Sequence, residues 1–329
     1  MDNHLKIITQ ILATENAGKI PPRRMAGSSD SSVYLANGKI YRLGRKDEIN
    51  DELKLIEEFR QLNIDFWIFP AIFQTTIRGE IMIAEMEFIG EQSIEDLLLS
   101  FRGSDSEFNR LIAVNRRILS LLDGLFLQTA NSNGALNDKL GFYHELIAAL
   151  QLNLAKAELL DDEATVLISR LENYPNLFLS DLILSKIHKD LSVGNVIIGS
   201  DDQPKLIDPR RAVPNLKVGS FWGSSAFDLV GYRVSLMRKI AEVKQNGTTA
   251  SLIGLIEETD LELKKGLVQK RFNPAMVELC HLVWYSIYCA CRCDYCLAPE
   301  RLWLYQKMKN ELGRYLTTID GLTKSRAKS

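Results

Sequence analysis

The stretch IHKDLSVGNVII, residues 187–198, and the stretch LIDPRR, residues 206–211, decide the fold of this chain. Each lies on an apolar, β-branched run, Val196–Ile198 in the first and Lys205–Ile207 across the start of the second, and such runs predict short buried strands. Glycine, serine and two aspartates between the runs predict a hairpin turn. The two stretches are therefore expected to form one β-hairpin with polar residues at its two ends.

Three oxygen-bearing side chains stand at the ends of this hairpin. Asp190 and Asn195 precede the first strand and Asp208 follows the second, so all three are expected to face one small volume. Oxygen ligands suit Mg²⁺, which commonly arrives with phosphate groups. A remaining carboxylate can orient a hydroxyl nucleophile and accept its proton. The pattern indicates phosphoryl transfer, and its alternative is an ordinary hairpin with acidic surface residues.

The order H-x-D-x-x-x-x-N, followed by an aliphatic pair and Asp, resembles the catalytic and metal-binding loops of the protein-kinase-like fold. Within that fold it is most similar to the aminoglycoside phosphotransferase and choline kinase family, over residues 25–320. That family usually reads H-G-D. Here Lys189 replaces the glycine, and Pro209 follows the aspartate where protein kinases carry Phe-Gly.

The resemblance implies roles for five residues. By motif position, Asp190 corresponds to the catalytic base, and Asn195 and Asp208 to the Mg²⁺ ligands. His188 corresponds to the residue that braces the catalytic loop. Asp228, within the sequence AFDL, corresponds to the aspartate that steadies this loop from below.

Composition describes an ordinary globular protein. Of 329 residues, 46% are hydrophobic and 25% are charged, and the formal net charge is −2. This balance gives no electrostatic footprint for nucleic acid. The N-terminus lacks a signal-peptide core, and no uncharged run is long enough to span a bilayer. The sequence therefore predicts a cytosolic protein without a nucleic-acid or membrane partner.

The expected fold class is α+β, a bilobal protein-kinase-like fold. An amphipathic helix over 3–17 and then mainly strands predict a β-rich nucleotide-binding lobe over residues 1–89. Helices dominate residues 90–329, which are expected to form the catalytic and substrate-binding lobe. A nucleotide is expected in the crevice between the lobes.

Small residues precede the first long strand and suggest a phosphate loop. Backbone N–H groups can approach phosphates closely there, and Ser28, Ser29 and Ser31 could add hydroxyl donors. Asp30 would repel phosphate, and there is one glycine rather than three. A plain polar turn is the alternative.

A hairpin follows, because Asn37-Gly38 favours a type I′ turn. Its second strand carries Arg42, and the resemblance implies that this residue reaches the nucleotide phosphates. An arginine fork suits phosphate oxygens. Lys39 is the rival cation on this strand, unless it lies on a solvated edge.

Two further nucleotide contacts are expected in the first lobe. Glu52 opens a predicted helix, Asn50–Phe59, and resembles the acid that pairs with the phosphate-binding cation; the alternative is a first-turn acid favoured by the helix dipole. The strand over 80–90 resembles the hinge. Backbone groups of Glu87 and Phe88 are the expected contacts for adenine.

Several features of the second lobe stay open. Arg210 and Arg211 could hold an anionic group or be solvated. Residues 219–225 could form a substrate-side loop or be packed by their aromatic side chains. Five cysteines within residues 280–296 could suggest zinc, but they flank an apolar helix-like run, which favours core packing.

The sequence thus predicts an ATP- and Mg²⁺-dependent kinase for a hydroxyl group of a small molecule. Acceptors resembling an aminoglycoside, choline or a sugar all remain open, as does the oligomeric state. The alternatives are a protein-directed kinase or nucleotidyl transferase, and a non-catalytic binding module. A short segment between Asp208 and Asp228, without an Ala-Pro-Glu signature inside it, disfavours a conventional protein kinase.

Overall fold

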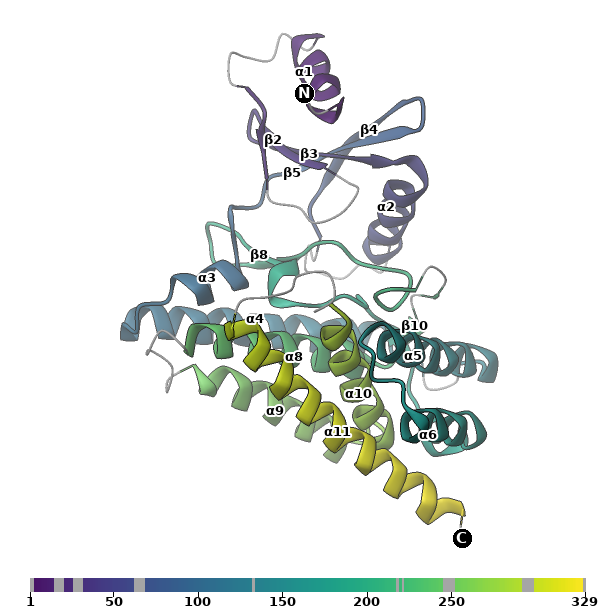
Figure 1. The fold of residues 1–329 in the computed structure, drawn as a ribbon. Helices are drawn as coiled ribbons and strands as arrows, with labels where there is room; N and C mark the ends of the chain where they lie inside the picture. Colours follow the sequence, from purple (N-terminus) through teal and green to yellow (C-terminus); the bar gives the residue numbers. More distant parts are fainter. Residues whose placement is uncertain are drawn as a thin grey trace. The chain divides into compact units, whose positions relative to one another are not determined.

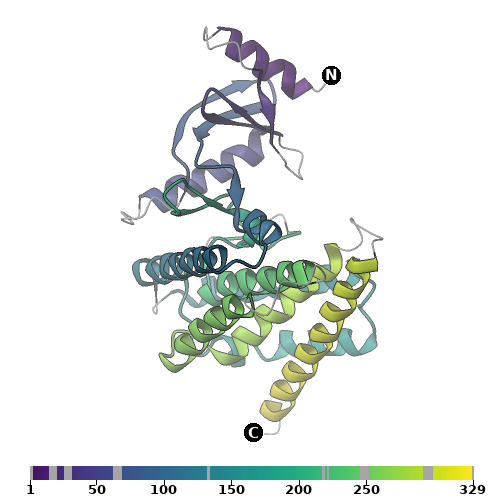
Figure 2. The ribbon, with the colours of Figure 1, turned by 90° about the vertical axis from the view of Figure 1, so that its left-hand side faces the viewer.

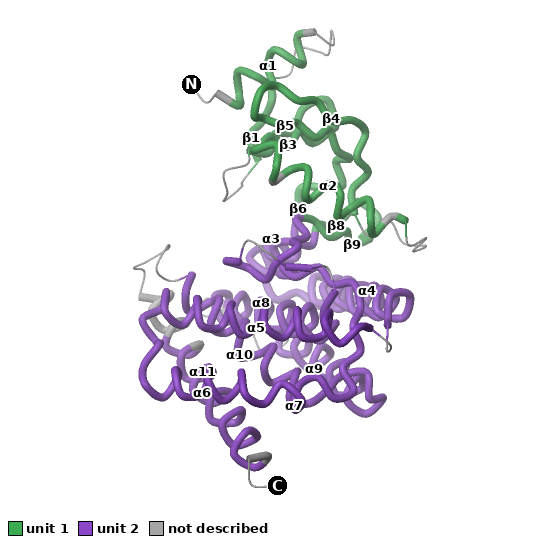
Figure 3. Tube along the Cα trace, turned by 90° about the vertical axis from the view of Figure 1, so that its right-hand side faces the viewer, with its two compact units in different colours: residues 1–91, 197–207 green, residues 92–196, 208–329 purple. Residues whose placement is uncertain are grey.

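The computed structural model divides into two compact units (Figures 1 and 3). The first comprises residues 1–91 and 197–207, and the second comprises residues 92–196 and 208–329. The predicted α+β class, with a small β-rich part and a larger helical part, is confirmed. The structure describes residues 3–14, 21–25, 32–61, 69–131, 134–216, 219–220, 222–244, 252–291 and 299–327.

The first unit is built on a five-stranded antiparallel sheet with the strand order β1-β2-β3-β5-β4. Two helices and the β8–β9 hairpin complete this unit. Its elements are α1 (Asn3–Thr14), β1 (Arg23–Arg24), β2 (Ser32–Ala36), β3 (Lys39–Arg45), α2 (Lys46–Arg60), β4 (Ile72–Arg78), β5 (Ile81–Glu87), β8 (Val196–Ile198) and β9 (Pro204–Leu206).

The predicted hairpins are present. Asn37 and Gly38 have φ angles of 51° and 70°, as the two central residues of a type I′ turn require. The turn sets the register of β2 on β3, in which Val33 lies opposite Arg42. β8 matches its predicted bounds, whereas β9 begins one residue earlier than predicted, at Pro204.

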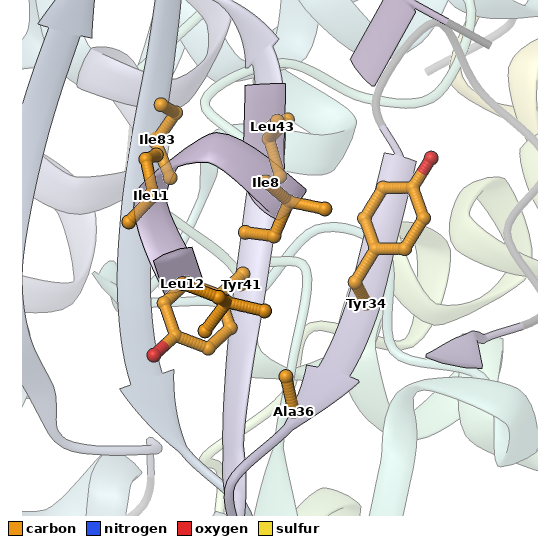
Figure 4. Packing of buried hydrophobic residues seen from close by; sticks show 8 residues of the cluster. All are labelled: Ile8, Ile11, Leu12, Tyr34, Ala36, Tyr41, Leu43 and Ile83. Atoms are coloured by element: carbon orange, nitrogen blue, oxygen red, sulfur yellow. The ribbon is translucent and has the colours of Figure 1, made fainter. Parts of the chain in front are cut away.

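A hydrophobic cluster joins α1 to the sheet (Figure 4). Ile8, Ile11 and Leu12 lie on one face of α1, as the sequence periodicity predicts. They pack with residues from three neighbouring strands, namely Tyr34, Ala36, Tyr41, Leu43 and Ile83. Helix α1 is described to Thr14, and the rest of the predicted helix over 3–17 lies outside the described residues.

Helix α2 begins at Lys46, so the prediction that it begins at Asn50 is wrong by four residues. The sequence carries no start signal at the true beginning, because the N-cap residue is Arg45 and no side chain caps the helix there. Glu52 consequently lies in the second turn of α2. It is not the first-turn acid that the dipole alternative required.

The second unit is mainly helical (Figure 2), and α10 packs against α5, α8 and α11 within it. Helix α3 begins after the N-cap residue Ser93, which forms a capping box with Asp96. The elements of the second unit are β6 (Gln92–Ser93), α3 (Ile94–Ser100), α4 (Asp105–Thr129), α5 (Leu136–Lys156), α6 (Asp162–Asn173), α7 (Asn176–Leu179), β7 (Ser185–Lys186), a 3₁₀ turn (Val193–Asn195), β10 (Trp222–Gly223), α8 (Ser225–Lys244), α9 (Ile253–Val268), α10 (Pro274–Cys291) and α11 (Pro299–Ala327).

The cysteines of α10 behave as core residues. Cys280 and Cys289 are buried free thiols, and Cys291 is partly buried. Cys293 and Cys296 lie outside the described residues. Within the described ranges, no three side chains of His, Cys, Asp or Glu gather as a metal site. None of the helices in those ranges combines the length and apolar character needed to cross a membrane.

Replacing Ile8 by Ala tests the contact between α1 and the sheet. Ile8 has no exposed surface, so the substitution should lower the free energy of unfolding of the first unit by about 3 kcal/mol through lost burial and a residual cavity. Urea denaturation measures this loss. The exposed neighbour Gln10, replaced by Ala, is the control; equal stability of both variants would show that α1 contributes little to the core.

Candidate functional site

The segment that contains Asp190 is held from below by Asp228. This carboxylate lies in the first turn of α8 and is 2% exposed. Its two oxygens accept hydrogen bonds from the backbone N–H groups of His188, at 2.6 Å, and Lys189, at 2.8 Å. Burial raises the pKa of Asp228 to about 7, while the two N–H donors and the charge of Lys189 oppose that shift. The backbone just before Asp190 is thereby fixed.

His188 connects this loop to the segment after Asp208. Its side chain is fully buried, and its Nδ1 accepts a long bond of 3.3 Å from the backbone N–H of Asp190. Its carbonyl oxygen accepts from the backbone N–H of Arg210 at 3.0 Å. The position of His188 therefore suits the bracing role that the resemblance implies.

Asn195 and Asp208 present the oxygen atoms expected for a cation. The side-chain NH₂ of Asn195 donates to the carbonyl oxygen of Asp190 at 2.8 Å, which orients the carboxamide and assigns its Oδ1 to any cation. Asp208 lies two residues after the end of β9 and has a φ angle of 59°, a left-handed conformation that aspartate tolerates better than most residues. Its negative charge raises the pKa of Asp190. Asn195 is thus hydrogen-bonded to the backbone of Asp190, and the charge of Asp208 acts on the carboxylate of Asp190.

Arg210 pairs with Asp190. Its Nε lies 2.7 Å from Oδ2 of the carboxylate, and the two side chains are 47% and 18% exposed, respectively. Burial raises the pKa of Asp190 to about 7; the charge of Arg210 works against this shift, and that of Asp208 adds to it. A carboxyl group with a pKa near neutrality suits general base chemistry. The sequence left the role of Arg210 open.

These residues fit Mg²⁺. Magnesium usually takes one or two protein oxygen ligands and completes its octahedron with water and phosphate oxygens. Oδ1 of Asn195 and the carboxylate of Asp208 supply that number of hard donors. Ligands for a softer metal, such as a group of His and Cys side chains, are not gathered in the described part of this unit.

Lys189 occupies the position where the resembling family carries glycine. Its φ angle is 64°, which glycine adopts without strain and which costs another residue about 1 kcal/mol. Its side chain is fully buried, and Nζ lies 2.5 Å from Oε2 of Glu145 on α5. Burial lowers the pKa of Lys189, and the Glu145 carboxylate opposes that shift. Sequence reasoning missed Glu145, because no local pattern links residues 44 positions apart.

In the first unit, Arg42 pairs with Glu52. Nη1 of Arg42 lies 2.8 Å from Oε1 of Glu52, and their side chains are 19% and 8% exposed. The expected pairing is therefore present. Lys39 is not simply solvated, because it pairs with the buried Glu85 and lies 5.4 Å from the ring centroid of Phe73.

The other nucleotide contacts predicted in the first unit have mixed outcomes. Ser28, Ser29 and Ser31 lie outside the described residues. Glu87 ends β5, and its backbone N–H donates to the carbonyl oxygen of Ala71 at 2.7 Å. Its carboxylate accepts from Lys205 at 2.7 Å. The N–H of Glu87 is thus engaged within the unit, and the contact of Glu87 and Phe88 with adenine stays a prediction.

The predicted substrate-side loop over 219–225 is only partly described, because Phe221 lies outside the described residues. Trp222 belongs to β10, which pairs with β7, and Nζ of Lys186 lies 5.8 Å from the centroid of its ring system. These contacts favour packing over a free loop for Trp222.

Comparison with solved structures identifies the fold. Aminoglycoside phosphotransferase APH(4)-Ia matches with a TM-score of 0.56 and 10% identity, over 98% of this chain and 99% of that chain. A glucosamine kinase matches with a TM-score of 0.55 and 12% identity, over 94% and 80%. Aminoglycoside phosphotransferase APH(3'')-Id from Streptomyces rimosus matches with a TM-score of 0.53 and 14% identity, over 88% and 99%.

The chain therefore has the fold of the aminoglycoside phosphotransferases, and the resemblance seen in the sequence is confirmed at the level of fold. No family model matches the sequence. No curated protein matches it either.

Replacing Asp228 by Ala tests the support beneath the loop. Two buried backbone N–H groups would lose a charged acceptor, which should lower the free energy of unfolding of the second unit by about 3 kcal/mol. Asp228→Asn keeps one acceptor oxygen and should lose less. Chemical denaturation measures both variants, and an Ala variant as stable as the parent would contradict the supporting role.

The Asp190–Arg210 pair predicts a measurable titration in the metal-free protein. The carboxyl carbon resonance of Asp190 in an NMR titration should move with a pKa of about 7. Arg210→Gln should raise that pKa further, since a stabilising positive charge is lost. An unchanged or lower pKa in the variant would show that the pair is not formed in solution.

The same shift has a consequence for stability. The pKa in the folded chain lies above the ordinary value of 3.8, so the folded chain binds this proton more tightly than the unfolded chain. The contribution of Asp190 to the free energy of unfolding should therefore fall as the pH rises from about 4 to about 7 and stay level above that range. Asp190→Asn should remove this component from the measured dependence of stability on pH.

Proposed function

We propose that this chain is an ATP- and Mg²⁺-dependent phosphotransferase that transfers the γ-phosphate to a hydroxyl group of a small molecule. One observation carries the proposal. The side chain of Asn195 is hydrogen-bonded to the carbonyl oxygen of Asp190, and the charge of Asp208 acts on the Asp190 carboxylate, whose pKa is raised to about 7; the oxygen atoms of Asn195 and Asp208 are of the kind that Mg²⁺ prefers. This combination suits phosphoryl transfer.

Two of the similar structures support the choice of ligands. One is a glucosamine kinase in complex with glucosamine, ADP and inorganic phosphate. Another is an APH(4)-Ia variant in a ternary complex with ADP and hygromycin B. Both proteins therefore bind an adenine nucleotide together with a small hydroxylated molecule. We propose that the present chain also binds an adenine nucleotide and a small hydroxylated molecule, and we do not assign the identity of that molecule.

In the proposed reaction, the residues of this chain divide three tasks. Asp190 orients the hydroxyl of the acceptor and takes its proton as the oxygen attacks the γ-phosphorus. Asn195 and Asp208 hold Mg²⁺, which neutralises charge on the nucleotide phosphates when bound. Arg42, oriented by Glu52, binds phosphate oxygens. Most of the catalysis is positioning and charge stabilisation.

Arg210 must also be accounted for, because it is the partner of Asp190 in the structure. While Asp190 is paired with Arg210, one of its oxygens accepts a hydrogen bond from the guanidinium, and the carboxylate is a weaker base. An entering hydroxyl donor competes for the same carboxylate. Arg210, which is 47% exposed, can then turn toward solvent or toward the transferred phosphate.

Transfer of label from γ-³²P-ATP to a polar metabolite extract, separated by chromatography, tests the proposal. The parent chain should produce a labelled small molecule only when Mg²⁺ is present. Asp190→Asn should reduce the rate at least about 100-fold, since a positioned base is lost. The affinity for Mg·ATP, measured by calorimetry, should stay within about threefold of the parent, because Asp190 is not assigned to the metal.

Asp208→Asn should behave differently from Asp190→Asn. It removes a charged metal ligand, so the affinity for Mg·ATP itself should fall by about tenfold or more. Asp105→Asn, at an exposed position in the first turn of α4, is the matched control and should leave both quantities unchanged. Equal loss in the Asp105 and Asp208 variants would contradict the metal assignment.

The outcomes also separate the alternatives. Label on protein rather than on a metabolite would favour a protein-directed kinase, and label from α-³²P-ATP would favour nucleotidyl transfer. A parent chain that is not stabilised against heat by Mg·ATP would favour a non-catalytic binding module, since a ligand of the native state must raise its stability.

A further inference from the structure

Glu145 on α5 contacts three segments of the second unit at one point. Its Oε2 lies 2.5 Å from Nζ of Lys189 in the loop that carries Asp190. Its Oε1 accepts a hydrogen bond from the backbone N–H of Val213 at 2.7 Å. A Cβ atom on Gly219 would lie 2.5 Å from the same Oε1, so only glycine permits this close approach. Both carboxylate oxygens of Glu145 are therefore engaged.

This contact is costly to maintain. The side chain of Lys189 is 0% exposed and that of Glu145 is 5% exposed, so both charges are removed from water. Desolvation of such a pair consumes much of the electrostatic attraction between its members. Lys189 also holds a left-handed backbone conformation that glycine would adopt without strain. An observed backbone outlier of this kind is a reason to look for a role of the side chain.

Two of the three segments carry the proposed chemistry. Lys189 directly precedes Asp190, and its backbone N–H is fixed by Asp228. Val213 lies five residues after Asp208, in the segment whose Arg210 pairs with Asp190. Because Glu145 bonds to both segments, it sets the spacing between the loop that carries Asp190 and the segment that follows Asp208. The hydrogen bond from the backbone N–H of Arg210 to the carbonyl oxygen of His188 also joins these two segments.

We infer that Glu145 and Lys189 are positioning residues, which hold the Asp190 loop and the 209–216 segment at the separation that transfer requires. The inference rests on the proposed function, since it assigns the pair to that same site. Neither residue touches the reacting atoms. Lys189 acts through the backbone of Asp190, and Glu145 acts through the backbone of Val213 and the charge of Lys189.

The rival explanation is that the pair only stabilises the second unit. Single substitutions cannot separate the two, because each would leave one buried charge without its partner and could prevent folding. A double variant avoids this. Lys189→Met with Glu145→Gln keeps an unbranched side chain one atom shorter at position 189 and the full length at position 145, removes both charges, and leaves a carboxamide oxygen that can accept from Val213.

The test compares this double variant with the parent and with a control at a second ion pair. Arg233→Met with Asp260→Asn removes the pair that joins α8 to α9, and neither residue is assigned a role in the reaction. The thermal transition of each protein and its affinity for Mg·ATP are measured. The kcat and KM are measured for transfer of the γ-phosphate to the acceptor or, in its absence, to water.

We expect the Lys189–Glu145 variant to remain folded and to bind Mg·ATP within about threefold of the parent, while kcat falls about 10- to 100-fold, as a misplaced catalytic group causes. The Arg233–Asp260 variant should keep the kcat of the parent. A kcat within about twofold of the parent in the folded Lys189–Glu145 variant would overturn the inference and leave a stabilising role.

Hydrogen exchange gives a readout that does not depend on turnover. In the Lys189–Glu145 variant, the amides of peptides over residues 187–196 and 209–216 should exchange faster than in the parent, whereas those of α9 should not. If the parent protein shows no turnover, the proposed function alone is contradicted. In that case, amide exchange in residues 187–196 and 209–216 that is equal in the variant and the parent would overturn the positioning role. A Lys189–Glu145 variant that fails to fold would also overturn it in favour of stability.

Discussion

The geometry of the second unit depends on one carboxylate that accepts two backbone hydrogen bonds. Asp228 lies at the start of α8 and binds the N–H groups of His188 and Lys189. The loop has little regular secondary structure of its own, only a 3₁₀ turn before β8. Backbone groups that no helix or strand satisfies must find other acceptors when they are buried. A buried acid supplies two acceptors at once, and the side chains around Asp190 take their directions from that anchor.

Around this anchor, the site is assembled mostly by contacts to the main chain. The carboxamide of Asn195 binds the carbonyl of Asp190, the carbonyl of His188 accepts from Arg210, and Glu145 accepts from Val213. Main-chain contacts fix position without depending on the identity of the residue that is held. Such a scaffold can tolerate Lys189 where the resembling family carries glycine, provided that the long side chain finds an acid within the interior.

Much of the site could be predicted from sequence, because its motif is local. Asp190, Asn195 and Asp208 lie within 19 residues around one hairpin, so their spacing alone predicts their arrangement. The turn at Asn37-Gly38 is equally local. Glu145 and Arg210 could not be assigned, since their partners are set by how α5 and the 209–216 segment fold in three dimensions. The start of α2 was misplaced because Arg45 provides none of the side-chain capping by which helix starts are recognised.

The division of the chain has a practical consequence for dissecting the protein. The polypeptide passes from one unit to the other three times, after residues 91, 196 and 207. A recombinant piece ending at residue 91 would lack β8 and β9, and with them the ammonium group of Lys205 that neutralises Glu87 at the end of β5. Gly90 would also lose the main-chain neighbour, Ile198, against which no larger residue could fit. The β-rich unit is thus completed by chain synthesised more than a hundred residues later, so cutting the gene after the codon for residue 91 would not yield two self-sufficient pieces.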